Sequence, residues 1–307
     1  MIPAKFDYVR PGSLDEAVHV LGNGGDDAKV IAGGQSLMPL LRLRLAYPSL
    51  LVDVGGLDEL RGVRDEGDSL LIGAGTTQHQ LVNDPLISEH CGLIAQAAGT
   101  VADPAVRHRG TIGGSLAHGD PAGDLPAVVL ALEATLTARG PDGDRDIAAS
   151  DFFVDYLTTA LQPTEILTAI RVPKLGGWGY RYEKFQPTAQ AWAIVGVAAL
   201  TKRSNGQVAE ARIGLTNMGP VPVRATAAEA AATGAEASRD ALRAAASQAD
   251  EGSEPPGDLH GAPDYRRHLA RVLTGRALAA AAGVLSMVIR FHESSCTRPD
   301  LSIRPSL

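Results

Sequence analysis

The sequence is poor in cysteine, in aromatic residues and in positive charge, and each shortage excludes a class of function. Its two cysteines, Cys91 and Cys296, cannot build a disulfide framework or supply the four thiolates of an ordinary iron–sulfur cluster. Aromatic residues make up 4% of the 307 positions, and 28 basic against 35 acidic side chains leave a net charge of −7. Nucleic-acid-binding proteins carry a basic footprint and stacking aromatics, so we expect no nucleic-acid partner.

Long apolar segments are missing as well. The N-terminal residues have no apolar core of the kind found in signal peptides. The longest apolar run, residues 277–289, is too short to cross a bilayer comfortably. We therefore expect a cytoplasmic protein without a membrane span, and its length favours two domains.

Motifs of several common enzyme classes are also absent. The sequence contains no P-loop and no G-x-G-x-x-G that opens a helix before a distant acidic residue, which argues against nucleotide hydrolysis and nicotinamide chemistry. It contains no G-x-S-x-G nucleophile elbow and no H-E-x-x-H. His79 fits a capping or packing role better than that of a base, and Cys91 lies in an apolar stretch typical of a core. We expect no catalytic side chain.

Two segments that are present share a pattern in which apolar residues lead into paired glycines and a small polar residue. The first consists of Ala32, Gly33, Gly34, Gln35 and Ser36, and the second of Thr111, Ile112, Gly113, Gly114 and Ser115. Paired glycines let successive N–H groups point the same way and let a ligand approach without a Cβ clash. Two such turns would suit the two phosphates of a dinucleotide, although either alone is more commonly a tight turn after a strand.

The second segment runs on into three polar side chains, His118, Asp120 and Asp124. These residues are weak candidates for metal ligands because no further His or Cys follows at ligand spacing. We predict no metal site. Asp120 precedes a proline and fits a turn, whereas Asp124 is better suited to accept hydrogen bonds from the hydroxyls of a ligand.

The periodicity predicts an α+β protein. Short strands and helices alternate up to a Pro- and Gly-rich boundary at 173–179, so we predict a first domain over 1–175, with lobes at about 1–55 and 56–175. A second domain, 176–285, should contain antiparallel strands at 180–185, 193–202 and 207–215. A hairpin turn at Asn205-Gly206 should be followed by helices over 225–249 and 264–284. Residues 286–307 form a tail for which disorder is one interpretation.

Together these segments resemble the FAD-binding medium subunit of molybdenum hydroxylases, the family of carbon monoxide dehydrogenase medium chains and xanthine dehydrogenase FAD subunits. The likeness extends from about residue 1 to about 285 and is most specific over 106–126. Further matching stretches are residues 32–41, 51–55, 182–185, 193–198 and 265–269.

The resemblance implies a two-lobed FAD-binding domain of the vanillyl-alcohol-oxidase (PCMH) type, followed by a domain of antiparallel sheet plus helices. In the family the two Gly-Gly segments hold the FAD pyrophosphate, and the carboxylate at Asp124 contacts hydroxyls of the ribityl chain or ribose. Lys184 and Trp192 fall where residues near the isoalloxazine are expected. Two departures stand out: His108 replaces a common Asn, and residues 186–191 lack the usual Arg and Asp.

The resemblance also implies partners. A large subunit with the molybdenum cofactor and a small subunit with two [2Fe–2S] clusters would join this chain in a dimer of heterotrimers, and FAD would pass the electrons to an external acceptor. The low cysteine count fits this division of labour. Two alternatives stay open: a self-sufficient FAD-dependent oxidase or dehydrogenase, and a flavin-free scaffold subunit.

Overall fold

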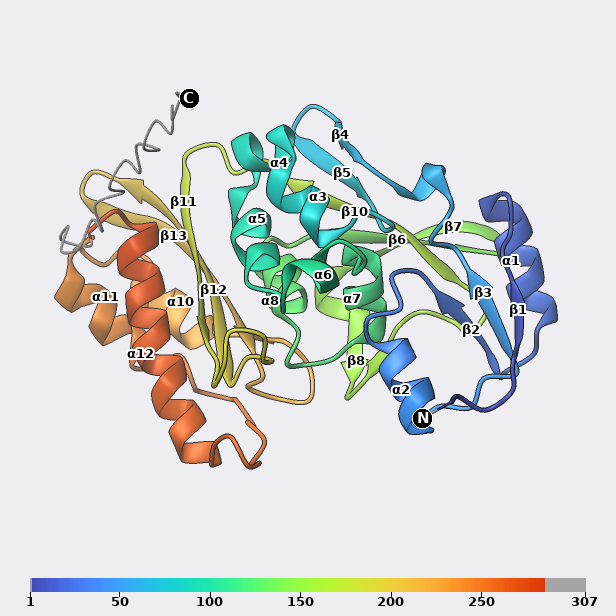
Figure 1. Cartoon of the computed structure of the whole chain (residues 1–307). Coiled ribbons are helices and arrows are strands. Elements are labelled where there is room, and N and C mark those ends of the chain that lie inside the picture. The colour runs from blue at the N-terminus through green and yellow to red at the C-terminus, as the bar shows by residue number, and fades with distance from the viewer. Residues whose placement is uncertain (1, 285–307) are drawn as a thin grey trace, which may run out of the picture.

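Three principal β-sheets with helices packed against them make up the chain (Figure 1). The computed structural model describes residues 2–284, so the expected tail at 286–307 lies outside the described residues. The strands are β1 (Asp7–Val9), β2 (Ala28–Ile31), β3 (Leu50–Asp53), β4 (Val63–Asp65), β5 (Ser69–Gly73), β6 (Thr135–Gly140), β7 (Gly143–Ala148), β8 (Phe153–Asp155), β9 (Thr158–Thr159), β10 (Ile166–Pro173), β11 (Trp178–Phe185), β12 (Val195–Ser204), β13 (Gln207–Thr216) and β14 (Val223–Arg224). The α-helices are α1 (Leu14–Asn23), α2 (Leu37–Leu43), α3 (Gln78–Asn83), α4 (Pro85–His90), α5 (Gly92–Gly99), α6 (Pro104–Arg107), α7 (Ile112–His118), α8 (Asp124–Ala131), α9 (Ala149–Phe152), α10 (Thr226–Ala232), α11 (Arg239–Ala246) and α12 (Pro263–Ala281).

The N-terminal lobe is a small parallel sheet in the order β1-β3-β2. Helix α1 begins after Ser13, whose hydroxyl caps the helix by accepting from the N–H of Glu16 at 3.2 Å. Its apolar face packs with β3 into a small core that includes Leu14, Leu21 and Val52. Because the three strands are parallel, their carboxyl ends meet at one edge of the sheet, where ligands commonly bind in α/β sheets.

The second sheet has the order β4-β5-β10-β6-β7, and every neighbouring pair in it is antiparallel. Its central strand, β10, comes last in the sequence and enters between β5 and β6. Helices α3, α5, α7 and α8 belong to the same lobe and bury an apolar core that contains Leu93, Ile94, Leu116 and Phe152.

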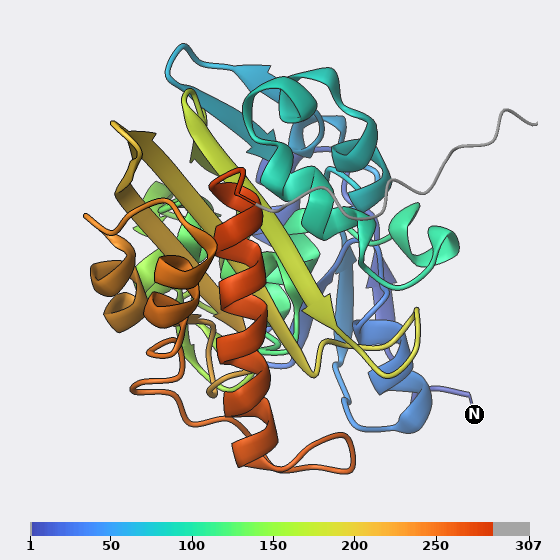
Figure 2. The same ribbon diagram turned by 90° about the vertical axis from the view of Figure 1, so that its left-hand side faces the viewer.

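The third sheet has the order β11-β12-β13-β14 and is covered on both faces. Helices α10, α11 and α12 pack on its outer face, and Figure 2 shows the long helix α12 upright in front of the slanted strands. Helices α5 and α8 of the preceding lobe lie against its inner face. Strand β12 is accordingly apolar on both sides: Val195 and Val197 join the outer core, while Ala198 and Leu200 join the inner one.

The predicted α+β class is confirmed, with three differences in detail. The second Gly-Gly segment is not a turn but the first turn of α7, and the Ala-rich stretch after β14 forms two short helices instead of a single run. Strands β7, β8, β9 and β14 were not predicted. The Asn205-Gly206 hairpin is confirmed, with φ of +51° and +80°, values typical of a type I′ turn. No helix within residues 2–284 is both long enough and apolar enough to cross a membrane.

Candidate functional site

A cavity of about 560 Å³ lies where the three sheets converge, a volume typical of small-molecule sites. The first Gly-Gly turn, α7 and the region where β11 ends all contribute to its wall. Twelve of the thirteen predicted cofactor residues line it: Ala32, Gly33, Gly34, Gln35, Ser36, Thr111, Gly113, Gly114, Ser115, Asp124, Lys184 and Trp192. The thirteenth, Ile112, has its side chain fully buried in the core of the second lobe.

The first Gly-Gly turn presents open backbone donors. It follows β2 at the carboxyl edge of the parallel sheet, and Gly34 has a φ of +72°, which favours glycine. Within residues 2–284, the backbone N–H groups of positions 33–36 donate to no protein acceptor. Arg42 and Arg109 line an adjoining groove with the same turn. Consecutive free N–H groups, with two arginines in the adjoining groove, suit an anionic ligand such as a pyrophosphate.

The second Gly-Gly segment is arranged differently, because its donors are already engaged. Thr111 caps α7 by accepting from the N–H of Gly114 at 3.0 Å. The N–H of Ile112 donates to the Thr76 carbonyl at 3.0 Å, and that of Gly113 donates to the Ala74 carbonyl at 2.8 Å. What this segment offers the cavity is the exposed surface of Gly114 and the half-buried Ser115.

The structure gives a different reason why glycine is needed at positions 33 and 113. A Cβ on Gly33 would overlap the carbonyl of Arg109, and one on Gly113 would lie 2.7 Å from the Ala74 oxygen. Both glycines therefore let the chain pack on itself, whereas ligand approach was the expected reason. A Cβ on Gly114 would meet only its own cap, Thr111 Oγ1, at 2.9 Å, and Gly114 is exposed at the cavity wall.

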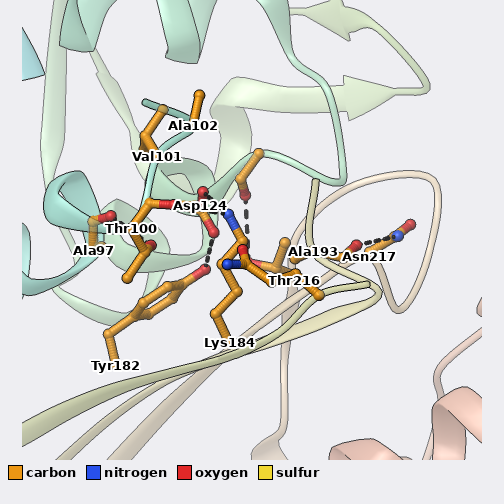
Figure 3. Close-up of polar contacts among 12 residues, drawn as sticks. Ala97, Thr100, Val101, Ala102, Asp124, Tyr182, Lys184, Ala193, Thr216 and Asn217 are labelled. Atoms are coloured by element: carbon orange, nitrogen blue, oxygen red, sulfur yellow. Dashed lines mark hydrogen bonds and ion pairs between the residues drawn. The ribbon is translucent and has the colours of Figure 1, made fainter. Parts of the chain in front are cut away.

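Asp124 lies at the centre of a buried polar cluster that joins the second lobe to the third sheet (Figure 3). It is the first residue of α8 and is 4% exposed. Its Oδ1 accepts from the Tyr182 hydroxyl at 2.6 Å, and its Oδ2 accepts from Lys184 Nζ at 2.8 Å. Lys184 Nζ also donates to the carbonyl of Thr100 at 3.1 Å. The ammonium group of Lys184 is thus held by the protein itself.

Burial and charge act in opposite directions in this cluster. Burial raises the pKa of Asp124, while the neighbouring Lys184 ammonium and the Tyr182 hydroxyl oppose that rise. Burial and the adjacent carboxylate place the pKa of Tyr182 well above its usual range, so its hydroxyl remains a donor. The N-terminal end of α8 adds favourable electrostatics for a carboxylate at Asp124.

Trp192 borders the cavity from the loop between β11 and β12 and is 55% exposed. Gln190 and Ala191 of the same loop also line the cavity. This is the segment that departs from the family pattern, and it contributes no charged side chain to the wall.

Several residues at the site were not anticipated from the sequence. Tyr182 opens the matching stretch 182–185, but no role was predicted for it, although strand alternation places it on the same face as Lys184. Gln78 is buried at the cavity wall, and its Oε1 has no hydrogen-bond partner among residues 2–284. Leu157 and Leu161, which frame the short β9 strand, add apolar wall.

The other candidates lie outside the site or serve the core. His79 does not line the cavity and stacks on His108 with ring centroids 3.8 Å apart. Cys91 is fully buried, as expected of a core residue. His118 and Asp120 border the cavity, but no group of three or more His, Cys, Asp or Glu residues within 2–284 is placed to hold a metal ion.

The fold and this cavity define a binding site for an anionic small molecule, built from both parts of the chain. The first turn offers it open backbone donors, Asp124 offers a carboxylate, and Gln78, whose buried Oε1 has no hydrogen-bond partner among residues 2–284, also lines the wall. Residues 4–175 match the family described as the FAD-binding domain in molybdopterin dehydrogenase. Residues 180–281 match the CO dehydrogenase flavoprotein C-terminal domain.

Individual relatives agree with the two family matches. The carbon monoxide dehydrogenase medium chain of Hydrogenophaga pseudoflava is 42% identical over 92% of this chain and 98% of its own length. Subunit alpha of the 6-hydroxypseudooxynicotine dehydrogenase complex of Paenarthrobacter nicotinovorans is 38% identical over 92% and 96%. The structure of quinoline 2-oxidoreductase from Pseudomonas putida 86 matches with a TM-score of 0.89 at 34% identity, covering 93% of this chain and 100% of the other.

The chain therefore belongs to the family of FAD-binding medium subunits of molybdenum-containing hydroxylases. It is an oxidoreductase subunit whose cofactor is FAD.

Proposed function

We propose that this chain is the electron-transfer subunit of a molybdenum hydroxylase, which takes electrons from [2Fe–2S] clusters of a small subunit and passes them to an external acceptor. A large subunit would carry the molybdenum cofactor, and the complex would be a cytoplasmic dimer of heterotrimers. Two observations support the partners: the relatives are named as medium chains or subunits, and two cysteines cannot ligate the clusters within this chain.

The open backbone donors of residues 33–36, beside Arg42 and Arg109, are the observation that carries the cofactor assignment. In this proposal the first turn holds the FAD pyrophosphate, and Gly114 and Ser115 complete that part of the wall. Asp124 receives hydroxyl groups of the cofactor, and the wall near Lys184 and Trp192 faces the isoalloxazine. FAD, when bound, supplies the two-electron redox chemistry. The protein binds it, orients it and shields it from water.

We also propose the domain limits as an FAD-binding domain over 1–175 and a C-terminal domain over 176–285. Strand β10 ends at Pro173 and β11 begins at Trp178, so the boundary falls in the connection between them. The second domain contributes Lys184 to the cavity wall, and its Tyr182 donates to Asp124 of that wall, so in this proposal the cofactor site draws on both domains.

The test is the visible absorption spectrum of the tagged chain purified gently from its native host. Flavin bands overlaid with iron–sulfur absorbance, together with co-purifying large and small chains, are the expected result. Flavin bands without partner chains would favour a self-sufficient oxidase and refute the electron-transfer assignment. A colourless chain that also fails to bind added FAD would refute the cofactor site itself.

A further inference from the structure

We infer that Tyr182 is a positioning residue for the cofactor: its buried hydroxyl fixes the Asp124 carboxylate at the cavity wall, and FAD affinity depends on that bond. This inference rests on the proposed function, in which Asp124 receives hydroxyl groups of FAD. It gives the C-terminal domain a direct part in cofactor retention, because Tyr182 belongs to β11.

The geometry shows that the contact is built in and not incidental. Tyr182 is 4% exposed, and its hydroxyl lies 2.6 Å from Asp124 Oδ1. A Cβ on Gly196 of β12 would come within 2.6 Å of that hydroxyl, so the neighbouring strand leaves room for it. Figure 3 shows the phenol and Lys184 approaching the carboxylate from the same strand.

Each partner of Asp124 has a separate task. Lys184 supplies the positive charge on Oδ2, whereas the Tyr182 hydroxyl is neutral and holds Oδ1. Each carboxylate oxygen retains acceptor capacity after one hydrogen bond, so Asp124 can still receive a donor from the cavity. Loss of the Tyr182 bond would free the carboxylate to rotate and leave Oδ1 without its donor, which disfavours the ionised form.

The decisive variants are Tyr182→Phe and, as a matched control, Tyr180→Phe. Phenylalanine keeps the ring packed in the core. Tyr180 lies two residues away on the same strand, and its hydroxyl rests against Gly92 of α5 instead of Asp124. FAD affinity of the full chain, measured by the quenching of flavin fluorescence, should weaken about tenfold in Tyr182→Phe at neutral pH, which is the factor that 1.4 kcal/mol carries. In Tyr180→Phe it should stay within about twofold.

Two further readouts separate positioning from mere structural support. In the Asp124→Asn background, Tyr182→Phe should change FAD affinity by less than about twofold, because a residue that acts through Asp124 loses its effect when the carboxylate is gone. The pH at which FAD affinity falls on acidification should move to a higher value in Tyr182→Phe, and the movement should vanish with Asp124→Asn. The other ionisable groups of the cavity wall, Lys29, His118, Asp120, Glu165 and Lys184, are unchanged in this comparison.

The outcomes are distinct. Equal FAD affinity and equal pH midpoints in wild type and Tyr182→Phe would overturn the inference while leaving the cofactor site intact. An effect of Tyr182→Phe that persists undiminished with Asp124→Asn would show a structural role and would also overturn it. A wild-type chain that binds no FAD would instead contradict the proposed function.

Discussion

Replacing each of the two helical glycines of α7 by alanine should separate folding from cofactor binding. Gly113 and Gly114 are adjacent in the first turn of the same helix, so alanine brings both positions a similar gain of about 1 kcal/mol in helix propensity. Their surroundings differ. A Cβ at position 113 would lie 2.5 Å from the Cβ of Ala74 and 2.7 Å from its oxygen, whereas one at 114 faces the cavity and approaches only the Thr111 hydroxyl.

The magnitudes follow from these contacts. Overpacking costs about 1–3 kcal/mol, and pushing α7 away from β5 also weakens the buried bond from the N–H of Gly113 to Ala74, worth about 1 kcal/mol. Net of the helix gain, Gly113→Ala should lower the free energy of unfolding by about 2 kcal/mol. Gly114→Ala should leave it within about 1 kcal/mol of wild type and weaken FAD binding at least about tenfold, because its methyl group occupies cavity space.

Urea unfolding should be measured on FAD-free protein, since a bound ligand stabilises the folded state by itself. FAD affinity is then titrated separately for each variant. A Gly113→Ala protein with wild-type stability but no FAD binding would show that this glycine serves ligand approach, and would refute the packing argument. A Gly114→Ala protein with unchanged FAD affinity would place the cofactor away from this helix.

Three other outcomes are expected. Lys184→Met leaves Asp124 buried without its cation and should cost about 3 kcal/mol of stability at pH 7. Burial raises the pKa of Asp124 and so favours its neutral form, which needs no cation. The urea midpoint of Lys184→Met should therefore fall less below that of wild type at pH 5 than at pH 8. Burial raises the pKa of the Cys91 thiol to about 12, so in a Cys296→Ser variant a thiol reagent at pH 8 should react only after unfolding; prompt reaction in the folded protein would contradict that burial. Buried Arg266 donates a hydrogen bond to the backbone carbonyl of Ile194. Arg266→Met leaves that carbonyl without its donor and should lower the free energy of unfolding by about 2 kcal/mol. An unchanged midpoint in thermal unfolding would show that this hydrogen bond does not stabilise the fold.

Local patterns were sufficient for most of the secondary structure. Apolar stretches predicted β11, β12 and β13, and the Asn205-Gly206 pair predicted the hairpin because its left-handed backbone requires such residues. The position of β10 between β5 and β6 was not predictable, since strand order depends on pairing between residues far apart in the sequence. The helical state of Gly113 was missed because tertiary packing on Ala74 overrides the low helix propensity of glycine.

The site divides in the same way. The Gly-Gly segments were visible as motifs, and both line the same cavity; that they share a ligand stays a prediction. The sequence did not show that the N–H groups of the first segment are free while those of the second are engaged. Whether an N–H is free depends on where carbonyls such as that of Ala74 lie in the folded chain. The bond between Tyr182 and Asp124 spans 58 positions and leaves no local signal. Long-range polar pairs of this kind appear only once the sheets are assembled.

The late position of β10 in the sequence has a consequence for biosynthesis. While the ribosome has delivered only the residues up to β7, the second sheet lacks its central strand, and β5 and β6 have nothing to pair with between them. Ile166 and Leu167 of β10 belong to the cavity wall, and the strand that bears Lys184 is made later still. The nascent chain must therefore expose unpaired strand edges until β10 emerges. The cavity that we propose for the flavin is complete only after Trp192, which follows β11, has left the exit tunnel.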